Sequence, residues 1–407
     1  MIVRSLLLAL AVALLLAVAA GCGAAREAGD AASLAPASAK ALAEIDGDLD
    51  SDQWEATRDL LSRFPDGGKL FDELPELGEA IGDQIVVVAL SDEKGLALTQ
   101  PDDAGKLRSL VSEYHLVSRE IEGWTAVAED AATLDAYERA LEGGTLDGDE
   151  TYEAARSALP DDSLATLYAR GETKAEWTAL ALTAEDDGFR LAGRIKTASA
   201  DGLEAVDPGA LSQVPGDALA VLAFGGGDFL SELPDTLGID LAPIEDALSG
   251  GAVVWVRPGA PIPEVTAVLP NADAVTLDLL AMAFTGSTPE DTELEGQPAK
   301  RIAAGPVTIT YADIDGRLVL TTGGSLGGTG QVGDIPGVQE GREKVGIEAR
   351  GLVYVDVQRV ASLLSLLGGL GEVPPELTRN LEHVDWLYAA YGGEGPEQEI
   401  GLFLAIR

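Results

Sequence analysis

The strongest constraint on this chain is an unbroken apolar run near its start. Fifteen consecutive apolar residues extend from Leu6 to Ala20, and Arg4 is the one charged residue before them. A run of this length, preceded by a cation and closed by small residues, is typical of a secretory signal. It is shorter than the roughly 18 residues expected of a membrane-spanning helix. We therefore expect residues 1–21 to be a signal peptide and the rest of the chain to fold outside the cytoplasm.

The residues that close this run predict a lipid anchor. Ala19-Ala20-Gly21-Cys22 is similar to the lipobox of bacterial lipoproteins, where the signal is cut before a cysteine that is then acylated. The leucine usual at the third position before the cysteine is Ala19 here. Cys22 is the only cysteine in 407 residues, so the chain can form no disulfide within itself. Because two acyl chains, such as palmitate, anchor a protein stably, we expect Cys22 to hold the protein on the bacterial cell membrane.

The net charge of the chain restricts the classes of partner that it can bind. The sequence has 27 Lys and Arg against 69 Asp and Glu, and removing residues 1–21 takes away Arg4 alone, which changes the net charge from −42 to −43. Such a body repels phosphate backbones and anionic head groups, which argues against nucleic acid and against adhesion to an acidic bilayer. A cation or a basic partner would suit it. The simpler interpretation is a solvated acidic surface that keeps an anchored protein soluble.

Composition and periodicity divide the chain after the signal into three segments. Residues 22–38, the acylated cysteine and an Ala/Gly/Ser-rich stretch with Pro36, predict a flexible tether. Residues 39–200 predict a first α+β unit and residues 201–407 a second. In the first unit we expect a helix with Trp54, Leu61 and Phe64 on one face, a helix opened by 101–103 and a helix ended by 143–144. We also expect strands at 85–90, 96–99, 124–128 and 164–168 and a hairpin over 177–195.

Five short patterns recur in the same order in both halves, at spacings of about 179 to 209 residues, and favour an internal duplication. Adjacent strands are joined by short turns, which favours largely antiparallel sheets with helices packed on one face. The predicted fold is therefore α+β with two similar units. The recurring pairs are Ala35-Pro36 with Val214-Pro215, Gly82-Asp83 with Gly250-Gly251, Leu98 to Pro101 with Val268 to Pro270, Gly123 with Gly316, and Glu176-Trp177 with Asp385-Trp386.

One stretch resembles a catalytic motif. Gly323-Gly324-Ser325-Leu326-Gly327 matches the G-x-S-x-G nucleophile elbow, and Asp356 and His383 follow in the chain order of an α/β-hydrolase triad. The elbow needs a helix directly after the serine, whereas Gly327-Gly328-Thr329-Gly330 is a poor helix start. A loop is the simpler interpretation, and a serine hydrolase using Ser325 is kept as a second alternative.

A run of acids near the start of the first unit is spaced like a calcium loop. The EF-hand pattern wants Gly at its sixth position and Glu at its twelfth, where this chain has Ser51 and Thr57. Acids that cap the next helix explain the run equally well. The calcium candidates are Asp46, Asp48, Asp50 and Asp52.

Other chemistry-bearing residues are sparse, and no cofactor is predicted. Gly225-Gly226-Gly227 could cradle a phosphate, but it is not G-x-G-x-x-G, and Asp228 places negative charge there. His115 and His383 show no zinc-ligand spacing. The five tryptophans are expected in the core, with a groove lined by some of them as the alternative.

Three stretches resemble an uncharacterised family of bacterial, mostly actinobacterial, envelope lipoproteins, the domain-of-unknown-function family three-three-five-two. The resemblance implies an extracytoplasmic lipoprotein or membrane-tethered protein and implies no reaction and no site residues. The stretches are the acidic turn before Gln53-Trp54 running to Leu60-Leu61-Ser62-Arg63-Phe64-Pro65, Gly82-Asp83 before an apolar strand, and Ala158-Leu159-Pro160-Asp161-Asp162.

Together these features predict a non-enzymatic lipoprotein, anchored outside the cell through Cys22, that acts as a binding or scaffold module of the cell envelope. The alternative is a carrier of a lipid or another apolar envelope molecule. The expected partners are the membrane, through the anchor, and a protein or a lipid, but not nucleic acid.

Overall fold

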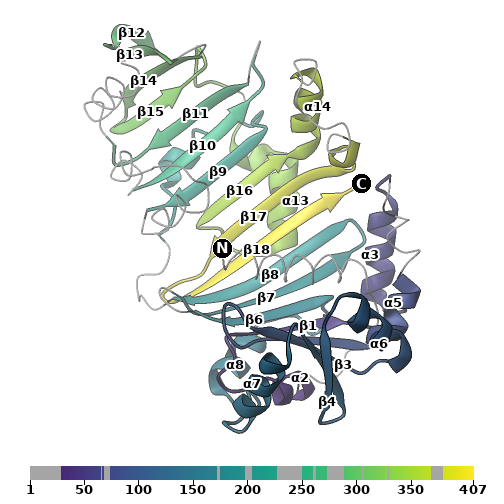
Figure 1. Ribbon diagram of the computed structural model, residues 1–407. Coiled ribbons are helices and arrows are strands. Elements are labelled where there is room, and N and C mark those ends of the chain that lie inside the picture. Colours follow the sequence, from purple (N-terminus) through teal and green to yellow (C-terminus); the bar gives the residue numbers. More distant parts are fainter. Residues whose placement is uncertain are drawn as a thin grey trace. The chain divides into compact units, whose positions relative to one another are not determined.

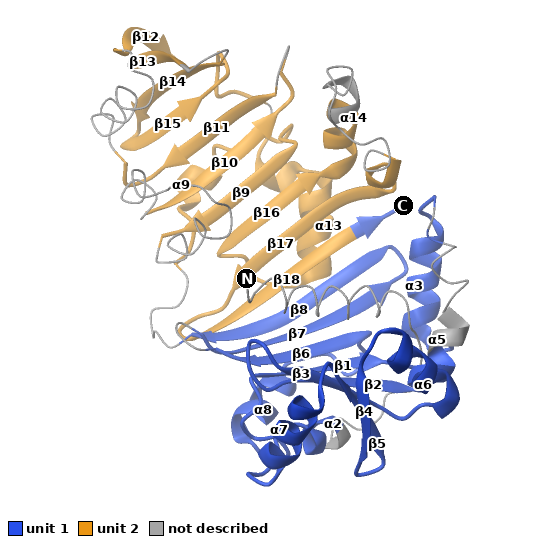
Figure 2. Cartoon of the chain, in the orientation of Figure 1, with its two compact units in different colours: residues 1–200, 405–407 blue, residues 201–404 orange. Residues whose placement is uncertain are grey.

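A computed structural model describes residues 29–65, 67, 74–171, 175–197, 204–226, 250–259, 263–272, 288–304, 307–328, 330–367 and 379–407. These residues form helices and antiparallel strand pairs, so the predicted α+β class is confirmed. The chain divides into two compact units, residues 1–200 with 405–407 and residues 201–404 (Figure 2).

Unit 1 is built on one antiparallel sheet whose strands run in the order β4–β5–β3–β2–β1–β6–β7–β8 (Figure 1). Its elements are α2 Gly29–Leu34, β1 Ala41–Asp46, α3 Asp52–Ser62, α5 Leu74–Ile81, β2 Gln84–Ala89, β3 Gly95–Thr99, α6 Ala104–Glu113, β4 Val117–Ile121, β5 Trp124–Ala128, α7 Ala131–Leu141, α8 Glu150–Arg156, β6 Ala165–Arg170, β7 Ala175–Glu185 and β8 Gly188–Thr197.

Unit 2 is also built on antiparallel strands, in the order β12–β13–β14–β15–β11–β10–β9–β16–β17. Its elements are α9 Pro208–Leu211, β9 Ala220–Gly225, β10 Gly251–Arg257, β11 Glu264–Leu269, β12 Glu290–Leu294, β13 Gln297–Ala304, β14 Val307–Ile314, β15 Arg317–Thr321, the 3-10 helix η3 Val332–Asp334, α13 Pro336–Val345, β16 Gly351–Asp356, α14 Val357–Leu367, β17 Val384–Gly392 and β18 Glu397–Ile406.

Local sequence signals fix the helices of unit 1. The Ser51 side chain accepts the Trp54 backbone N–H at the start of α3, and Asp103 accepts the N–H groups of Gly105 and Lys106 at the start of α6. These caps satisfy backbone donors that a helix start leaves free. The helices predicted over α3, α6 and α7 and the strands predicted over β2, β3 and β5 are confirmed.

The core of unit 1 lies on one face of its sheet, which we call the packed face. Leu42, Val88 and Tyr168 point to this side from three adjacent strands. Tyr137 of α7 and Tyr152 of α8 are buried in the same cluster, so these helices cover the packed face. The side chains of alternate residues point to opposite faces of a strand, so Ala43 and Val87 lie on the other side. We call that side the open face.

The predicted flexible tether is wrong from Gly29 onward. Residues 29–34 form α2, and Ala31, Leu34 and Ala35 are almost completely buried in the core of unit 1. The Tyr137 hydroxyl donates to the Leu34 carbonyl over 2.6 Å and ties α2 to α7. Small apolar residues resemble a linker in composition, yet they are also the residues that pack closely under a sheet.

The expectation that helices pack on one face alone is also wrong for unit 1. Thr99 follows Leu98 of the packed face and so points to the opposite side, where its hydroxyl donates to the Ile81 carbonyl at the end of α5. Trp54 and Leu60 of α3 are fully buried but lie outside the packed-face cluster. Helices therefore also cover one end of the open face.

In unit 2 the packed face is covered by α13. Gly337 and Gly341 lie one helical turn apart, and a Cβ atom at either would lie within 3 Å of an aromatic side chain of β16 or β17. The rings concerned are those of Tyr354, which approaches Gly337, and Tyr388, which approaches Gly341. The two glycines thus allow the helix axis to approach the sheet closely. In the part of the chain that the structure describes, no helix is long and apolar enough to span a membrane.

Candidate binding surface

The predicted lipidation site, Cys22, lies outside the described residues, as do residues 1–21 of the predicted signal. Acylation therefore stays a prediction. The first described residue, Gly29, follows Cys22 after six residues. The folded body of unit 1 thus begins close along the chain to the expected anchor.

The acids proposed for calcium bond instead to their own backbone and to a helix cap. The Asp46 carboxylate accepts the Ser51 hydroxyl at 2.9 Å and the Asp48 N–H at 3.3 Å, and Asp48 accepts the Asp50 N–H. Asp52 is the first residue of α3. Among the described residues, no group of three or more His, Cys, Asp or Glu side chains could hold a metal ion.

Asp46 is electrostatically unusual among these acids. Burial at the end of β1 raises its pKa to about 7, and the nearby Asp48, Asp162 and Asp83 add to the rise, while the Ser51 hydroxyl opposes it. Burial disfavours a carboxylate because the charged form loses its hydration. Asp46 therefore titrates near neutrality.

The residues of the hypothetical serine-hydrolase triad are not brought together around Ser325; His383 lies in the turn before β17. Ser325 is exposed in a loop after β15, and no helix follows it directly. Asp356 ends β16, which is four strands away across the pairs β15–β11–β10–β9–β16. Four strand spacings amount to roughly 19 Å, too far for a hydrogen-bonded triad. Asp356 pairs instead with Arg359.

The remaining candidate residues take structural roles or fall outside the described part. Gly225 and Gly226 are buried at the end of β9, and Gly227 and Asp228 lie outside the described residues. His115 has a positive φ of 57° in the turn after α6. Of the five tryptophans, Trp54, Trp124, Trp177 and Trp255 are buried, as expected for core residues.

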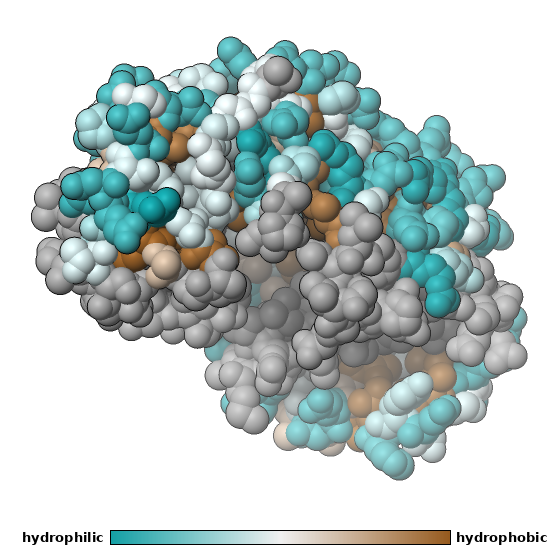
Figure 3. All heavy atoms as spheres, turned by 90° about the horizontal axis from the view of Figure 1, so that it is seen from above, coloured by the Kyte–Doolittle hydropathy of each residue, from teal (hydrophilic) through white to brown (hydrophobic). Residues whose placement is uncertain are grey.

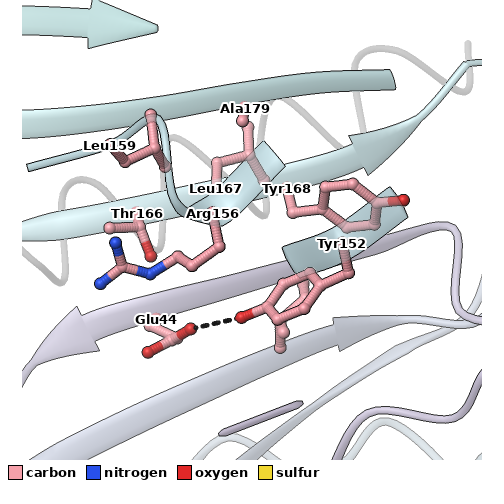
Figure 4. Close-up of a pocket in the computed structure, with 9 residues that line it drawn as sticks. Glu44, Tyr152, Arg156, Leu159, Thr166, Leu167, Tyr168 and Ala179 are labelled. Atoms are coloured by element: carbon pink, nitrogen blue, oxygen red, sulfur yellow. Dashed lines mark hydrogen bonds between the residues drawn. The ribbon is translucent and has the colours of Figure 1, made fainter. Parts of the chain in front are cut away.

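A small polar cavity lies under α8 in unit 1 (Figure 4). The Tyr152 hydroxyl donates to Glu44 over 3.1 Å, and burial raises the pKa of Glu44. Arg156 points into the same space, with Tyr168 beside Tyr152. The cavity measures about 10 Å³, which is the lower limit for one water molecule. It is too small for an organic ligand.

The open face of unit 1 is left partly uncovered by its described helices. The strand registers align seven side chains in one row across seven strands, and we call this row central row 1. Each of the seven is partly exposed, and none is polar or charged. They are Val127, Ala97, Val87, Ala43, Leu167, Leu180 and Gly193.

The rows on either side of central row 1 are more mixed. One contains Ala89, Ala41 and Ala169 and continues to Thr178. The other contains the partly exposed Ile85, Ala165 and Leu182, but its Ile45 and Thr99 are buried. Seven strands at about 4.8 Å spacing span roughly 29 Å, so central row 1 forms an apolar strip of about that length. Contiguous exposed apolar surface can mark an interaction site.

Unit 2 has a corresponding row on the side opposite α13, and at one end this row packs into a hydrophobic cluster that includes the buried Tyr311. The registers align Tyr311, Leu320, Ala267, Val254, Leu222, Val353 and Ala389, which we call central row 2. Leu222 is 43% exposed, and Val265, on the same face of β11, is 40% exposed. Figure 3 shows hydrophobic residues reaching the surface among hydrophilic ones.

An apolar outer face is unusual for an antiparallel sheet. Such sheets commonly alternate between apolar residues toward the core and polar residues toward water. Sequence reasoning missed this surface, although a signal was present. The unbroken apolar runs at 85–90 and 252–256 are typical of strands that are covered on both faces.

Comparison with known proteins adds little to this description. No protein-family model and no curated protein matches the chain. A solved structure described as crystal form I of TP0453 matches 42% of this chain and 80% of its own at 7% identity, with a TM-score of 0.25. A likeness at this score carries no argument about fold or function.

Proposed function

We propose that this protein is a non-enzymatic, membrane-anchored extracytoplasmic lipoprotein whose open sheet faces bind an apolar partner. The single observation that supports this most is the pair of central rows. In a chain with 24% charged residues, both rows consist of uncharged side chains, and all of these except the buried Tyr311 keep part of their surface exposed. Apolar surface of this extent is favourably removed from water by a bound partner.

We also propose that the two units arose by internal duplication. Their strand orders support it. The order β4–β5–β3–β2–β1–β6–β7 in unit 1 corresponds strand for strand to β14–β15–β11–β10–β9–β16–β17 in unit 2. The unit 2 hairpin of β12 and β13 and the helix α14 are then insertions.

The turns and registers support the same duplication. Glu122-Gly123 between β4 and β5 and Asp315-Gly316 between β14 and β15 both have positive φ at two successive residues, the signature of a type I′ turn. Trp177 lies opposite the last residue of β6, and Trp386 lies opposite the last residue of β16. A duplication of one ancestral unit would give each unit its own open face.

Binding of an uncharged apolar dye tests the proposed surface. We expect Nile red to bind both open faces of the full chain, and Leu222→Glu to weaken the binding at the face of unit 2 at least about tenfold, which corresponds to about 1.4 kcal/mol. Full burial of a leucine contributes roughly 1.5–3 kcal/mol, and a buried carboxylate adds a further cost. Because Leu222 is 43% exposed, the variant should still fold.

Tyr114→Glu is the matched control. Tyr114 is a large hydrophobic residue, 66% exposed, in the turn after α6, away from both central rows. Its replacement by the same acid should leave Nile red binding unchanged. Equal binding by the wild type and Leu222→Glu, or equal loss in both variants, would contradict the proposed surface.

A further inference from the structure

The chemistry of central row 1 restricts what can lie on it. Ala43, Val87 and Leu167 carry no hydrogen-bonding group, and the backbone between them is paired in the ladders of β1, β2 and β6. A ligand with polar groups along its length would leave those groups without partners, at a cost of roughly 1–3 kcal/mol each. The row therefore suits a ligand segment without donors or acceptors, which describes a hydrocarbon chain.

The dimensions of the open face also fit such a chain. Central row 1 extends over roughly 29 Å across the strands. A hydrocarbon chain of a bilayer lipid spans half of a core that is about 30 Å thick, so it measures about 15 Å. The face of unit 1 can thus cover one or two complete chains with the residues described.

The start of the folded body places this face near a source of lipid. If Cys22 is acylated as proposed, the seven residue-to-residue steps from Cys22 to Gly29 span at most about 25 Å, at about 3.6 Å per residue. Because α2 is packed into the core, unit 1 cannot move further from the bilayer than this reach. The protein then works within one membrane thickness of the lipid surface.

Charge selects among the lipids in that membrane. The body without its signal carries 69 acidic residues and, after loss of Arg4, 26 basic ones. Approach of an anionic head group is repelled by this field, whereas a zwitterionic head group carries no net charge. The hydrocarbon chains of a net-neutral lipid therefore fit both the face and its surroundings.

We propose that the open face of unit 1 takes up the hydrocarbon chains of a net-neutral membrane lipid, with central row 1 as the contact surface. This inference rests on the proposed function and names its ligand class. A second copy of the chain or an apolar peptide would be the alternative occupants, and the experiment below separates them.

Photocrosslinking from a bilayer tests the proposal. The full acylated chain is bound to phosphatidylcholine vesicles that contain a phosphatidylcholine with a diazirine in its acyl chain, irradiated, digested and mapped by mass spectrometry. We expect crosslinks at Val87, Val127, Leu167 and Leu180. The double variant Ala43→Phe/Ala97→Phe fills the row without adding charge and should lower the yield there at least fivefold.

Ala132→Phe is the control, because it adds the same ring at an exposed position of α7. It should leave the yield unchanged. If the double variant fails to fold, the map of crosslinked residues in the wild type decides. Replacing the carrier and probe lipids by phosphatidylglycerol, which is anionic, should reduce the yield.

Two outcomes overturn the proposal in different ways. Crosslinks spread over exposed helices would contradict lipid binding at central row 1. So would the absence of crosslinks from this row. If Leu222→Glu still weakens Nile red binding in either case, the proposed function stands without the lipid as its ligand. Zero-length crosslinks between two copies at this row would assign it to a dimer instead. Absence of both lipid crosslinks and Nile red binding would reject the proposed function as well.

Discussion

Asp46 shows how a single carboxyl group can make the stability of this fold depend on pH. It lies where β1 ends and hydrogen-bonds to Ser51, the residue that caps α3. Its ordinary pKa is 3.8, and burial beside other acids raises the pKa to about 7. Between these values the unfolded chain has released the proton while the folded protein still holds it.

We therefore predict that this group makes the free energy of unfolding fall as the pH rises from about 4 to 7, because the native state binds more protons there. Asp46→Asn should remove that slope. At pH 8 the variant should be more stable than the wild type by about 1–2 kcal/mol, a value reduced for the partial exposure of the carboxyl group. Urea unfolding at pH 4.5 and pH 8 measures this.

Asp50→Asn is the control for this prediction. Asp50 is exposed and lies in the same acidic run, so its replacement should change the unfolding free energy by less than about 0.5 kcal/mol. An unchanged pH slope in Asp46→Asn would refute the assignment to Asp46.

A second prediction at the residue scale concerns the processing and acylation of Cys22. The mature wild-type protein should begin at residue 22 and carry the mass of two or three acyl chains, measured on the N-terminal peptide. Cys22→Ala should remain at the mass of the precursor and lack the added chains. A wild-type protein whose Cys22 thiol is free in the membrane fraction would contradict the proposed anchor.

At the scale of elements, the close approach of α13 to its sheet depends on two residues without side chains. A Cβ atom at Gly341 would lie 2.4 Å from the Cβ atom of Tyr388, which is fully buried. We expect Gly341→Ala to lower the free energy of unfolding by about 1–3 kcal/mol, because overpacking outweighs the gain in helix propensity of about 1 kcal/mol.

Gly333→Ala is the matched control, since a Cβ atom at Gly333 would meet nothing within 4 Å. It should change stability by less than about 0.5 kcal/mol in the same urea titration. Similar losses in both variants would show that α13 is not packed as described.

Elements with strong local signals could be predicted from the sequence. The cap at Ser51, the apolar run at 85–90 and the paired glycines at 143–144 gave α3, β2 and the end of α7 nearly at their true bounds. These features act over a few residues, so no knowledge of the remaining chain is needed.

Features that depend on tertiary packing could not be predicted in the same way. The Ala-rich residues of α2 have the composition of a linker, and their burial depends on contacts with α7 more than 100 residues later, such as the Leu34–Tyr137 hydrogen bond. The residues of the open face could not be identified without the strand registers, because a shift of one residue moves every side chain of a strand to the other face. Ser325 and Asp356 follow one another in the order of a triad, yet the strand order separates them.

At the scale of the whole molecule, we propose a lipid anchor at Cys22 together with an apolar row on each unit. In unit 1, α2, α7 and α8 cover the packed face, α3 and α5 cover one end of the open face, and an uncharged row crosses the open face; acids far outnumber bases in the whole chain. Such a body stays soluble beside a membrane and still offers apolar surface for a partner. Binding without chemistry then needs no catalytic group on either face.

Native mass spectrometry of the full chain, purified from membranes in a mild detergent, tests this central claim most directly. The account predicts a non-covalent adduct with the mass of a net-neutral lipid, in addition to the acyl chains on Cys22. The adduct should decrease in Ala43→Phe/Ala97→Phe and persist in Tyr114→Glu. A folded, acylated protein that carries no lipid, or that carries it equally in all variants, would contradict the account.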